Sequence, residues 1–160
     1  MKHRKPMQIK GRANPISLVK VSGKDTRGVS FLYSLLKSRK HNISHTTTPS
    51  FSEHKKFVRN HPYRAWFLIQ KRNNYIGSIY VYKNNGIGIS VKSGKEDCIW
   101  PAITILLKKI KPLKGIKSAR HAEFGVYAAP TDKKLIAVLK KMGSHFAQVT
   151  FLIPSEGLRR

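Results

Sequence analysis

Residues 65–91 show the alternation of apolar and polar positions that predicts β-strands rather than helices. The alternation is interrupted twice, by a basic turn at residues 71–74 and by a second turn at residues 83–86. The second turn contains the pair Asn85-Gly86, and both residue types tolerate the positive φ angles that tight hairpins need. The pattern therefore predicts an antiparallel meander of three strands, at residues 66–70, 75–82 and 87–91.

Periodic segments flank this meander on both sides. Before it, the spacing of apolar residues predicts a strand at 16–21 and helices at 29–37 and 51–60. After it, the spacing predicts a helix at 99–110, a strand at 119–128, a helix at 133–142 and a last strand at 146–153. The predicted order is strand, helix, helix, three strands, helix, strand, helix, strand.

The length of 160 residues suits one domain with a sizeable core. We expect a basic mobile arm at residues 1–14, a single domain at 15–154 and a basic tail at 155–160. No apolar run approaches the roughly 20 residues of a membrane span, and the basic start lacks the apolar segment of a signal peptide. These features predict a soluble, non-secreted, cytoplasmic protein.

Charge adds the strongest compositional signal. The chain has 32 Lys and Arg against 7 Asp and Glu, a formal net charge of +25. Such a field attracts polyanions, and the most abundant inside cells are DNA and RNA. A basic surface that is merely solvated is the alternative, and an anionic membrane surface fits less well because no clean amphipathic helix with a basic face is present.

A nucleic-acid partner would be held mainly through phosphate, with tolerance of sequence and steep salt dependence. The sequence has no helix-turn-helix, RNP or zinc-finger pattern that would read bases. The candidate contacts are basic residues in the arm, at the end of the first helix and after the third: Lys2, Arg4, Lys5, Lys10, Arg12, Lys37, Arg39, Lys40, Lys108, Lys109, Lys111, Lys114 and Lys117.

The sequence gives little indication of a metal site or a disulfide bond. The single cysteine, Cys98, excludes an internal disulfide and a cysteine-based zinc site. His41 and His45 are four residues apart, but they lie in a predicted loop rather than on a helix face. We therefore expect no metal.

Several phrases of the chain resemble the Gcn5-related N-acetyltransferase (GNAT) superfamily. They are NISH at 42–45, PSF at 49–51, NxPYxxW at 60–66, IGSIY at 76–80 and GI at 88–89. The similarity covers residues 16–153 and is strongest before residue 91. It implies an α/β (α+β) fold in which about four helices flank a mixed central sheet of about six or seven strands, with a V-shaped splay between strands 4 and 5.

The same resemblance implies acetyl-CoA, or another acyl-CoA, as cofactor and N-acyl transfer to an amine as activity. In such enzymes the pantetheine amides pair with the exposed edge of strand 4, and the pyrophosphate rests on backbone N–H groups at the start of the next helix. The corresponding edge residues here are Ile87, Ile89 and Val91. The corresponding loop residues are Lys92, Ser93, Gly94 and Lys95.

The chain departs from the family pattern at positions that carry chemistry. Gly86 replaces an acidic residue, Asp97 and Ile99 replace glycines of the phosphate loop, Ala129 replaces an Asn, and Leu139 replaces the Tyr that often protonates the leaving thiolate. Glu96 and Asp97 would also present negative charge to a pyrophosphate.

These departures leave three interpretations open. The first is a working acyltransferase in which Lys92 and Lys95 supply charge to the phosphates. The second is a catalytically degenerate module, a pseudoenzyme, that binds nucleic acid without acyl transfer. The third is a scaffold for partner proteins whose basic charge serves only solubility.

Three residues are candidates for proton transfer if the chain is an enzyme. His45 could act as a base near neutral pH, and Tyr80 and Tyr127 as proton donors. Each has a structural alternative: a loop histidine that bonds the backbone, or tyrosines that pack in the sheet with their hydroxyl groups satisfied.

Overall fold

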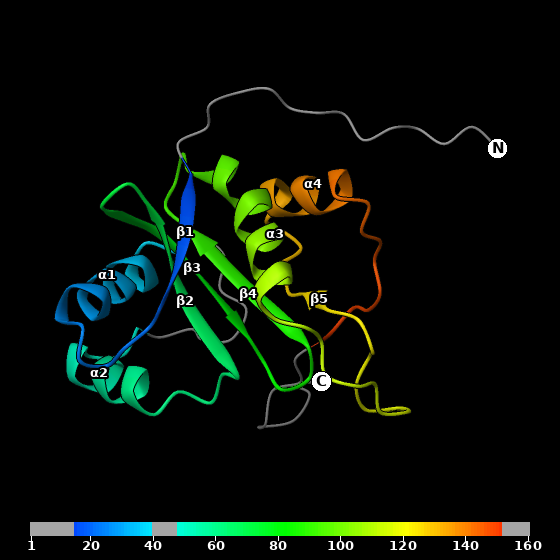
Figure 1. Cartoon of the computed structure of the whole chain (residues 1–160), viewed down its shortest axis with the longest axis horizontal. Helices are drawn as coiled ribbons and strands as arrows, with labels where there is room; N and C mark the ends of the chain where they lie inside the picture. Colours follow the sequence, from blue (N-terminus) through cyan, green and yellow to red (C-terminus); the bar gives the residue numbers. More distant parts are fainter. Residues whose placement is uncertain (1–14, 40–47, 152–160) are drawn as a thin grey trace, which may run out of the picture.

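A computed structural model describes residues 15–39 and 48–151 of the chain. The predicted arm at 1–14, the predicted tail at 155–160, His45 and Lys40 lie outside the described residues. A five-stranded sheet forms the centre, in the spatial order β1-β2-β3-β4-β5 (Figure 1). Neighbouring strands are antiparallel except β4 and β5, which are parallel. The strands are β1 Ile16–Lys20, β2 Ala65–Lys71, β3 Asn74–Val81, β4 Gly86–Val91 and β5 Gly125–Val126.

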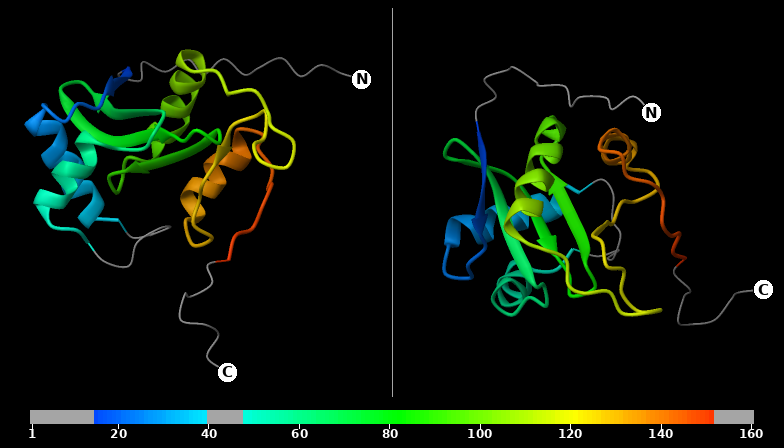
Figure 2. Two further views of the ribbon diagram at one scale, coloured as in Figure 1. Left: turned by 90° about the horizontal axis from the view of Figure 1, so that it is seen from below. Right: turned by 45° about the vertical axis from the view of Figure 1, so that its right-hand side comes forward.

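Helices cover both faces of the sheet (Figure 2). Helices α1 (Thr26–Lys37) and α2 (Phe51–Arg59) lie on one face, and α3 (Ile99–Lys109) and α4 (Lys133–Lys141) lie on the other. A single 3-10 turn, η1 (Glu96–Cys98), leads into α3. In the described parts of the chain, no helix is long and apolar enough to cross a membrane.

Capping side chains define where α1 and α2 begin. The Asp25 carboxylate accepts the Gly28 N–H at the start of α1, at 3.0 Å. Ser50 and Glu53 form a reciprocal capping box at the start of α2. These bonds satisfy backbone donors that a helix leaves without intrahelical partners, which explains why the helices start at these residues.

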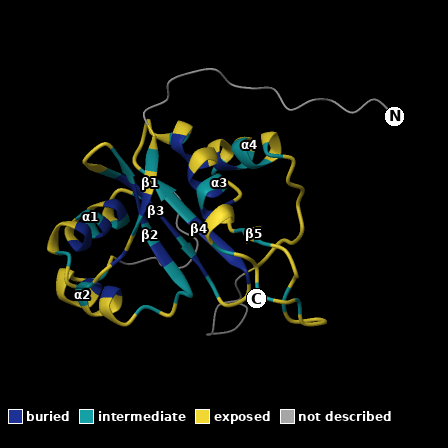
Figure 3. Cartoon of the chain, viewed as in Figure 1, coloured by how far each residue is buried: buried dark blue, intermediate teal, exposed yellow. Residues whose placement is uncertain are grey.

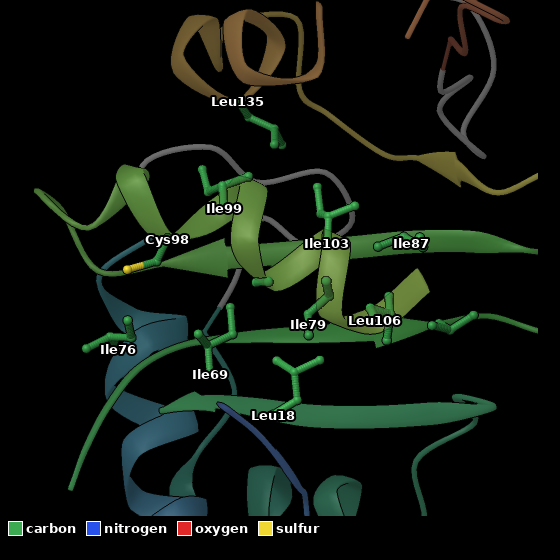
Figure 4. Close-up of a cluster of buried hydrophobic side chains, with 12 residues drawn as sticks. Leu18, Ile69, Ile76, Ile79, Ile87, Cys98, Ile99, Ile103, Leu106 and Leu135 are labelled. Atoms are coloured by element: carbon green, nitrogen blue, oxygen red, sulfur yellow. The ribbon is translucent and has the colours of Figure 1, made fainter. Parts of the chain in front are cut away.

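Two apolar clusters hold the layers together, one on each face of the sheet. The larger lies under α3, where Ile79 and Ile87 from the sheet meet Ile103 and Leu106 from the helix (Figure 4). The smaller lies under α1 and α2 and includes Trp66. Figure 3 shows the consequence: the helix faces toward the sheet are buried and the opposite faces are exposed.

His54 of α2 is a buried titratable group between the helices and is 5% exposed. Its Nε2 lies 3.3 Å from the Val29 carbonyl oxygen, which places the proton on this nitrogen in the neutral ring. Burial lowers the pKa of His54, and the positive charge of Arg39 lowers it further. The hydrogen bond to Val29 has the opposite effect and raises the pKa, but burial is the larger effect. Burial likewise lowers the pKa of His61.

We therefore expect the free energy of unfolding to fall as the pH decreases below about 6.5. The unfolded histidine binds a proton more tightly than the folded one, so the stabilisation is complete above the unfolded pKa and is lost as the pH falls through the folded pKa. Urea unfolding at several pH values measures the slope. His54→Gln should flatten it, whereas a slope that the exposed control His121→Gln reduces equally would contradict the assignment.

The strand count is lower than the sequence predicted. We expected six or seven strands, and the described residues form five. The strand predicted at 119–128 is reduced to Gly125–Val126, because β5 pairs with β4 only there. The strand predicted at 146–153 is not formed within its described part, residues 146–151, where the apolar Phe146 and Phe151 are 71% and 85% exposed. Residues 146–151 do alternate apolar and polar side chains, but no strand of the described residues pairs with them.

Candidate active site

The central feature of the candidate site is the divergence of β5 from β4. Gly125 N–H donates to the Asn85 carbonyl oxygen at 3.1 Å, and Tyr127 N–H donates to the Ile87 carbonyl oxygen at 2.9 Å. Among the described residues the β4–β5 ladder ends there. The chain then turns at Ala129, whose carbonyl oxygen accepts the Asp132 N–H at 2.9 Å, and enters α4. Within residues 15–39 and 48–151, the second half of β4 thus has no strand neighbour on its β5 side.

Register determines which backbone groups face that gap. Lys92 N–H bonds the Ile76 carbonyl and Tyr82 N–H bonds the Gly86 carbonyl, both at 2.8 Å, so the even-numbered residues of β4 bond to β3. In an antiparallel ladder the residues between them point their N–H and C=O groups the other way. Ile87, Ile89 and Val91 therefore face β5. Ile87 is engaged by Tyr127, and the free edge consists of Ile89 and Val91.

The loop after β4 forms a tight turn beside this edge. Lys95 N–H donates to the Lys92 carbonyl oxygen at 3.0 Å, and Gly94 adopts a φ of 77°, the left-handed region that favours glycine. Lys92, Ser93, Gly94 and Lys95 are all exposed. The predicted phosphate-loop residues thus form one exposed, basic turn at the end of the free edge.

The two carboxylates of this loop are both paired with lysines. Glu96 accepts from the Lys134 ammonium at 2.7 Å, and Asp97 lies 3.5 Å from the Lys71 ammonium. The Lys134 hydrogen bond, followed by backbone N–H groups of Glu96 and Gly94, lowers the pKa of the Glu96 carboxyl. The Glu96–Lys134 pair joins the phosphate loop to α4. It also engages the Lys134 ammonium and the backbone N–H groups of Glu96 and Gly94.

An aromatic cluster covers the opposite face of β3 and β4, toward α1 and α2. Tyr63 stacks on Tyr80 with ring centroids 4.3 Å apart, and Tyr82 contacts Tyr127 at 5.7 Å. Two glycines of β4 make room for these rings. A Cβ at Gly86 would meet Tyr127 at 2.4 Å, and a Cβ at Gly88, the residue paired with Tyr80, would meet that ring at 2.2 Å.

The two candidate tyrosines differ in environment. Burial, and next the neighbouring Tyr82, raise the pKa of Tyr80 to about 12. Tyr127 is 41% exposed, and its hydroxyl oxygen accepts from the Asn84 amide at 2.7 Å. Because that oxygen is engaged as an acceptor, its proton is available to an external acceptor. Of the two, Tyr127 is the better placed proton donor.

Arg39 follows α1 and lies close to this cluster. Its charge lowers the pKa values of Tyr63 and Tyr80 in opposition to their burial. Its Nε is shielded from solvent and has no hydrogen-bond partner within 15–39 and 48–151. The sequence suggested Arg39 only as a phosphate contact, and nothing in the pattern indicated its proximity to the tyrosines.

Comparison with known proteins was made by sequence and by structure. No protein-family model matches the chain, and no curated protein matches it by sequence. Solved structures do match. A possible acetyltransferase from Clostridium difficile 630 aligns with a TM-score of 0.56 at 11% identity, covering 88% of this chain and 97% of that one. The microcin self-immunity acetyltransferase MccE, in complex with acetyl-CoA and AMP, aligns with a TM-score of 0.56 at 15% identity, covering 82% and 79%.

An aminoglycoside acetyltransferase from an uncultured soil metagenomic sample, in complex with sisomicin, aligns with a TM-score of 0.52 at 13% identity. The alignment covers 88% of this chain and 97% of that one. The chain has the GNAT fold. At these identities the likeness is one of fold, and the chemistry depends on the residues of the site itself.

Four of the five departures from the family pattern, all except Asp97, have a packing counterpart here. Gly86 leaves the space that the Tyr127 ring fills. Ile99 is buried in the core under α3, and Leu139 of α4 packs against that core. Ala129 is buried at the turn into α4. These four positions thus contribute to packing in this chain.

Asn85 is a residue of this GNAT fold whose importance the sequence did not reveal. It is 1% exposed, with a φ of 66°. Its amide donates to the Leu113 and His121 carbonyl oxygens and its oxygen accepts the Leu113 N–H, all at 2.8 Å. These bonds fix the segment that leads into β5, and with it the width of the β4–β5 gap. The Asn-Gly pair signalled a turn but not this anchor.

The predicted nucleic-acid residues are dispersed over the GNAT fold. Lys37 ends α1 on one face of the sheet, with its ammonium 4.9 Å from the centroid of the Tyr33 ring. Lys108 and Lys109 end α3 on the opposite face. Lys111, Lys114 and Lys117 are exposed in the segment that follows α3. Lys2, Arg4, Lys5, Lys10, Arg12 and Lys40 lie outside the described residues.

Metal ligands are not clustered in the part of the chain that the structure describes: no group of three or more His, Cys, Asp or Glu is placed to hold an ion there. Cys98 is buried, and burial, followed by the Asp97 charge, raises the pKa of its thiol. A thiol of raised pKa is a weak nucleophile.

Proposed function

We propose that this protein transfers an acyl group from acyl-CoA to an amine acceptor. The observation that supports this proposal most strongly is the edge formed by Ile89 and Val91, with which no strand of the described residues pairs on the β5 side. This edge ends at the exposed basic turn of residues 92–95. A strand edge is suited to the two amides of pantetheine, and an exposed turn with lysine side chains is suited to a pyrophosphate. The acetyl-CoA bound by MccE, which shares the fold, supports acetyl-CoA as the ligand.

In the proposed reaction the acceptor nitrogen attacks the thioester carbonyl carbon and the C–S bond breaks. The thiolate takes a proton, for which Tyr127 is the proposed donor, and the nitrogen loses one to a base. His45 remains the predicted base. The aromatic cluster and Arg39 would contact the acceptor on the α1 and α2 side, while the coenzyme lies along the β4 edge. Enforced proximity of the two reactants is the main catalytic contribution expected of such a site.

Titration calorimetry with acetyl-CoA tests the proposal, and the variant Glu96→Gln tests whether the Glu96–Lys134 pair limits the affinity. We expect wild-type protein to bind, and the variant to bind several-fold more tightly, because Lys134 and the loop N–H groups become free for phosphate. Glu123→Gln, which removes one negative charge from an exposed position, serves as the matched control. Absence of binding at high coenzyme concentration would contradict the proposal, and equal gains in both variants would contradict the role of Glu96.

Binding to nucleic acid without acyl transfer is the second candidate function, and the net charge of +25 favours it. The exposed lysines after α3 would contact phosphates, with affinity that falls steeply as salt rises. A salt titration with DNA and RNA of mixed sequence separates this function from a scaffold role. An affinity that does not change between low and moderate salt would rule it out.

A further inference from the structure

A second basic site lies on the α1 side of the sheet, apart from the coenzyme edge. It is a cavity of about 710 Å³ where the β2–β3 turn, the start of α1 and the β4–η1 turn meet. Its lining includes five cationic side chains, Arg27, Lys71, Arg72, Lys92 and Lys95. This volume is within the range of pockets for small ligands.

The cavity keeps a positive balance because few carboxylates reach it. Asp97 lies 3.5 Å from Lys71. Asp25 caps α1 with one oxygen and accepts the Tyr75 hydroxyl with the other at 3.1 Å. Set against five cations, these two carboxylates leave an excess of positive charge. Crowding of like charges is unfavourable, and an anion that binds among them relieves the repulsion.

Two aromatic rings lie among the cations. The Arg27 guanidinium carbon is 5.0 Å from the Tyr75 ring centroid, and the Lys92 ammonium is 5.2 Å from the Phe31 centroid. Arg27 also donates to the Asn73 carbonyl oxygen, which holds the guanidinium at the mouth of the turn. Cations and planar groups on one wall suit a ligand that carries both phosphate and a flat ring.

Strand β4 separates this cavity from the edge proposed for the coenzyme. The Lys92 N–H bonds the Ile76 carbonyl of β3, and its side chain extends over Phe31 of α1. The edge of Ile89 and Val91 faces β5 instead. A ligand in the cavity would therefore leave the pantetheine edge free.

We propose that this cavity binds the phosphate groups of a nucleotide, with the base against the aromatic wall. The nucleotide is either free or part of a single strand of nucleic acid, and the two sources share the same recognition chemistry. The cavity shares Lys92 and Lys95 with the turn proposed for the coenzyme's pyrophosphate, whereas Arg27, Lys71 and Arg72 belong to the cavity alone. None of its five cations is among the lysines and arginines predicted from sequence as nucleic-acid contacts.

Arg72 offers the cleanest test. It is exposed with a φ of 55°, a conformation that Asn tolerates, so Arg72→Asn removes the charge without backbone strain. Arg27→Gln is a second variant. Lys83→Gln is the matched control, since the exposed Lys83 lies at the other end of the eight-residue β3, roughly 25 Å away.

Calorimetry with ADP should show binding that each cavity variant weakens by about tenfold and the control leaves within about twofold. Arg72→Asn and Arg27→Gln should leave the affinity for acetyl-CoA unchanged, because neither residue belongs to the turn of residues 92–95. Circular dichroism verifies that the variants fold. A short single-stranded oligothymidylate is the second probe: competition with ADP identifies a strand as the source of phosphate, and binding of ADP alone identifies a free nucleotide. Three results would overturn the proposal: no binding of either probe at millimolar concentration, equal weakening by the control, or an equal loss of acetyl-CoA affinity in the two cavity variants.

Discussion

Replacement of Tyr127 by Phe should lower kcat for acyl transfer by about 10²- to 10⁴-fold and leave the affinity for acetyl-CoA unchanged. Its hydroxyl is accessible, because the residue is 41% exposed, and its oxygen already accepts from Asn84. The ring fills the space over Gly86, and Phe preserves this packing. The variant thus removes the proposed proton donor, together with the hydrogen bond from Asn84, and keeps the ring.

The measurement is the initial rate of thiol release from acetyl-CoA, with an amine that supports turnover of the wild type. Tyr82→Phe is the matched control, because Tyr82 contacts the Tyr127 ring in the same cluster. We expect the control to stay within a few-fold of wild type. Unchanged kcat in Tyr127→Phe would remove this residue from the mechanism, and equal losses in both variants would indicate a packing effect.

Replacement of Asn85 by Gly should cost about 3 kcal/mol or more in the free energy of unfolding. Glycine keeps the positive φ but loses three hydrogen bonds, and the backbone groups of Leu113 and His121 lose their partners inside the protein. Leaving buried polar groups unsatisfied is more costly than the loss of the bonds alone. Urea unfolding measures the change.

Arg72→Gly is the control for this variant, because Arg72 also has a positive φ but its side chain is exposed. There we expect no loss, or a small gain, in stability. The Asn85 variant should also bind acetyl-CoA less tightly, since the segment leading into β5 is no longer held. A cost below about 1 kcal/mol would contradict the assigned role of the side chain.

The order of elements up to β4 could be predicted from the sequence because local alternation and capping residues specify it. The helix predicted at 51–60 is observed at Phe51–Arg59, and the capping box of Ser50 and Glu53 explains the agreement. The strands after α3 could not be predicted in the same way. Their existence depends on a neighbour, and residues 146–151 have the alternation without one.

The candidate site was predicted in part. Alternation along β4 places Ile87, Ile89 and Val91 on one side of the strand, and the family resemblance implied that this side is the coenzyme edge. The pairing of Glu96 with Lys134 could not be predicted, because the two residues are 38 positions apart and neither has a distinctive local signal. The packing of the Tyr127 ring over Gly86 is also a tertiary contact, and it could not be predicted from local sequence. The sequence indicated only a departure from the family at Gly86, and the ring that occupies the space explains it.

Amide hydrogen exchange with and without acetyl-CoA tests the central claim most directly. Without ligand, the Ile89 and Val91 amides should exchange rapidly because β5 pairs only with Gly86 and Ile87. The Gly88 and Ser90 amides face β3 and should exchange slowly throughout, as internal controls. Saturating acetyl-CoA should slow exchange at Ile89 or Val91 by about tenfold or more. Unchanged exchange at both residues, at a coenzyme concentration that saturates binding, would contradict the account.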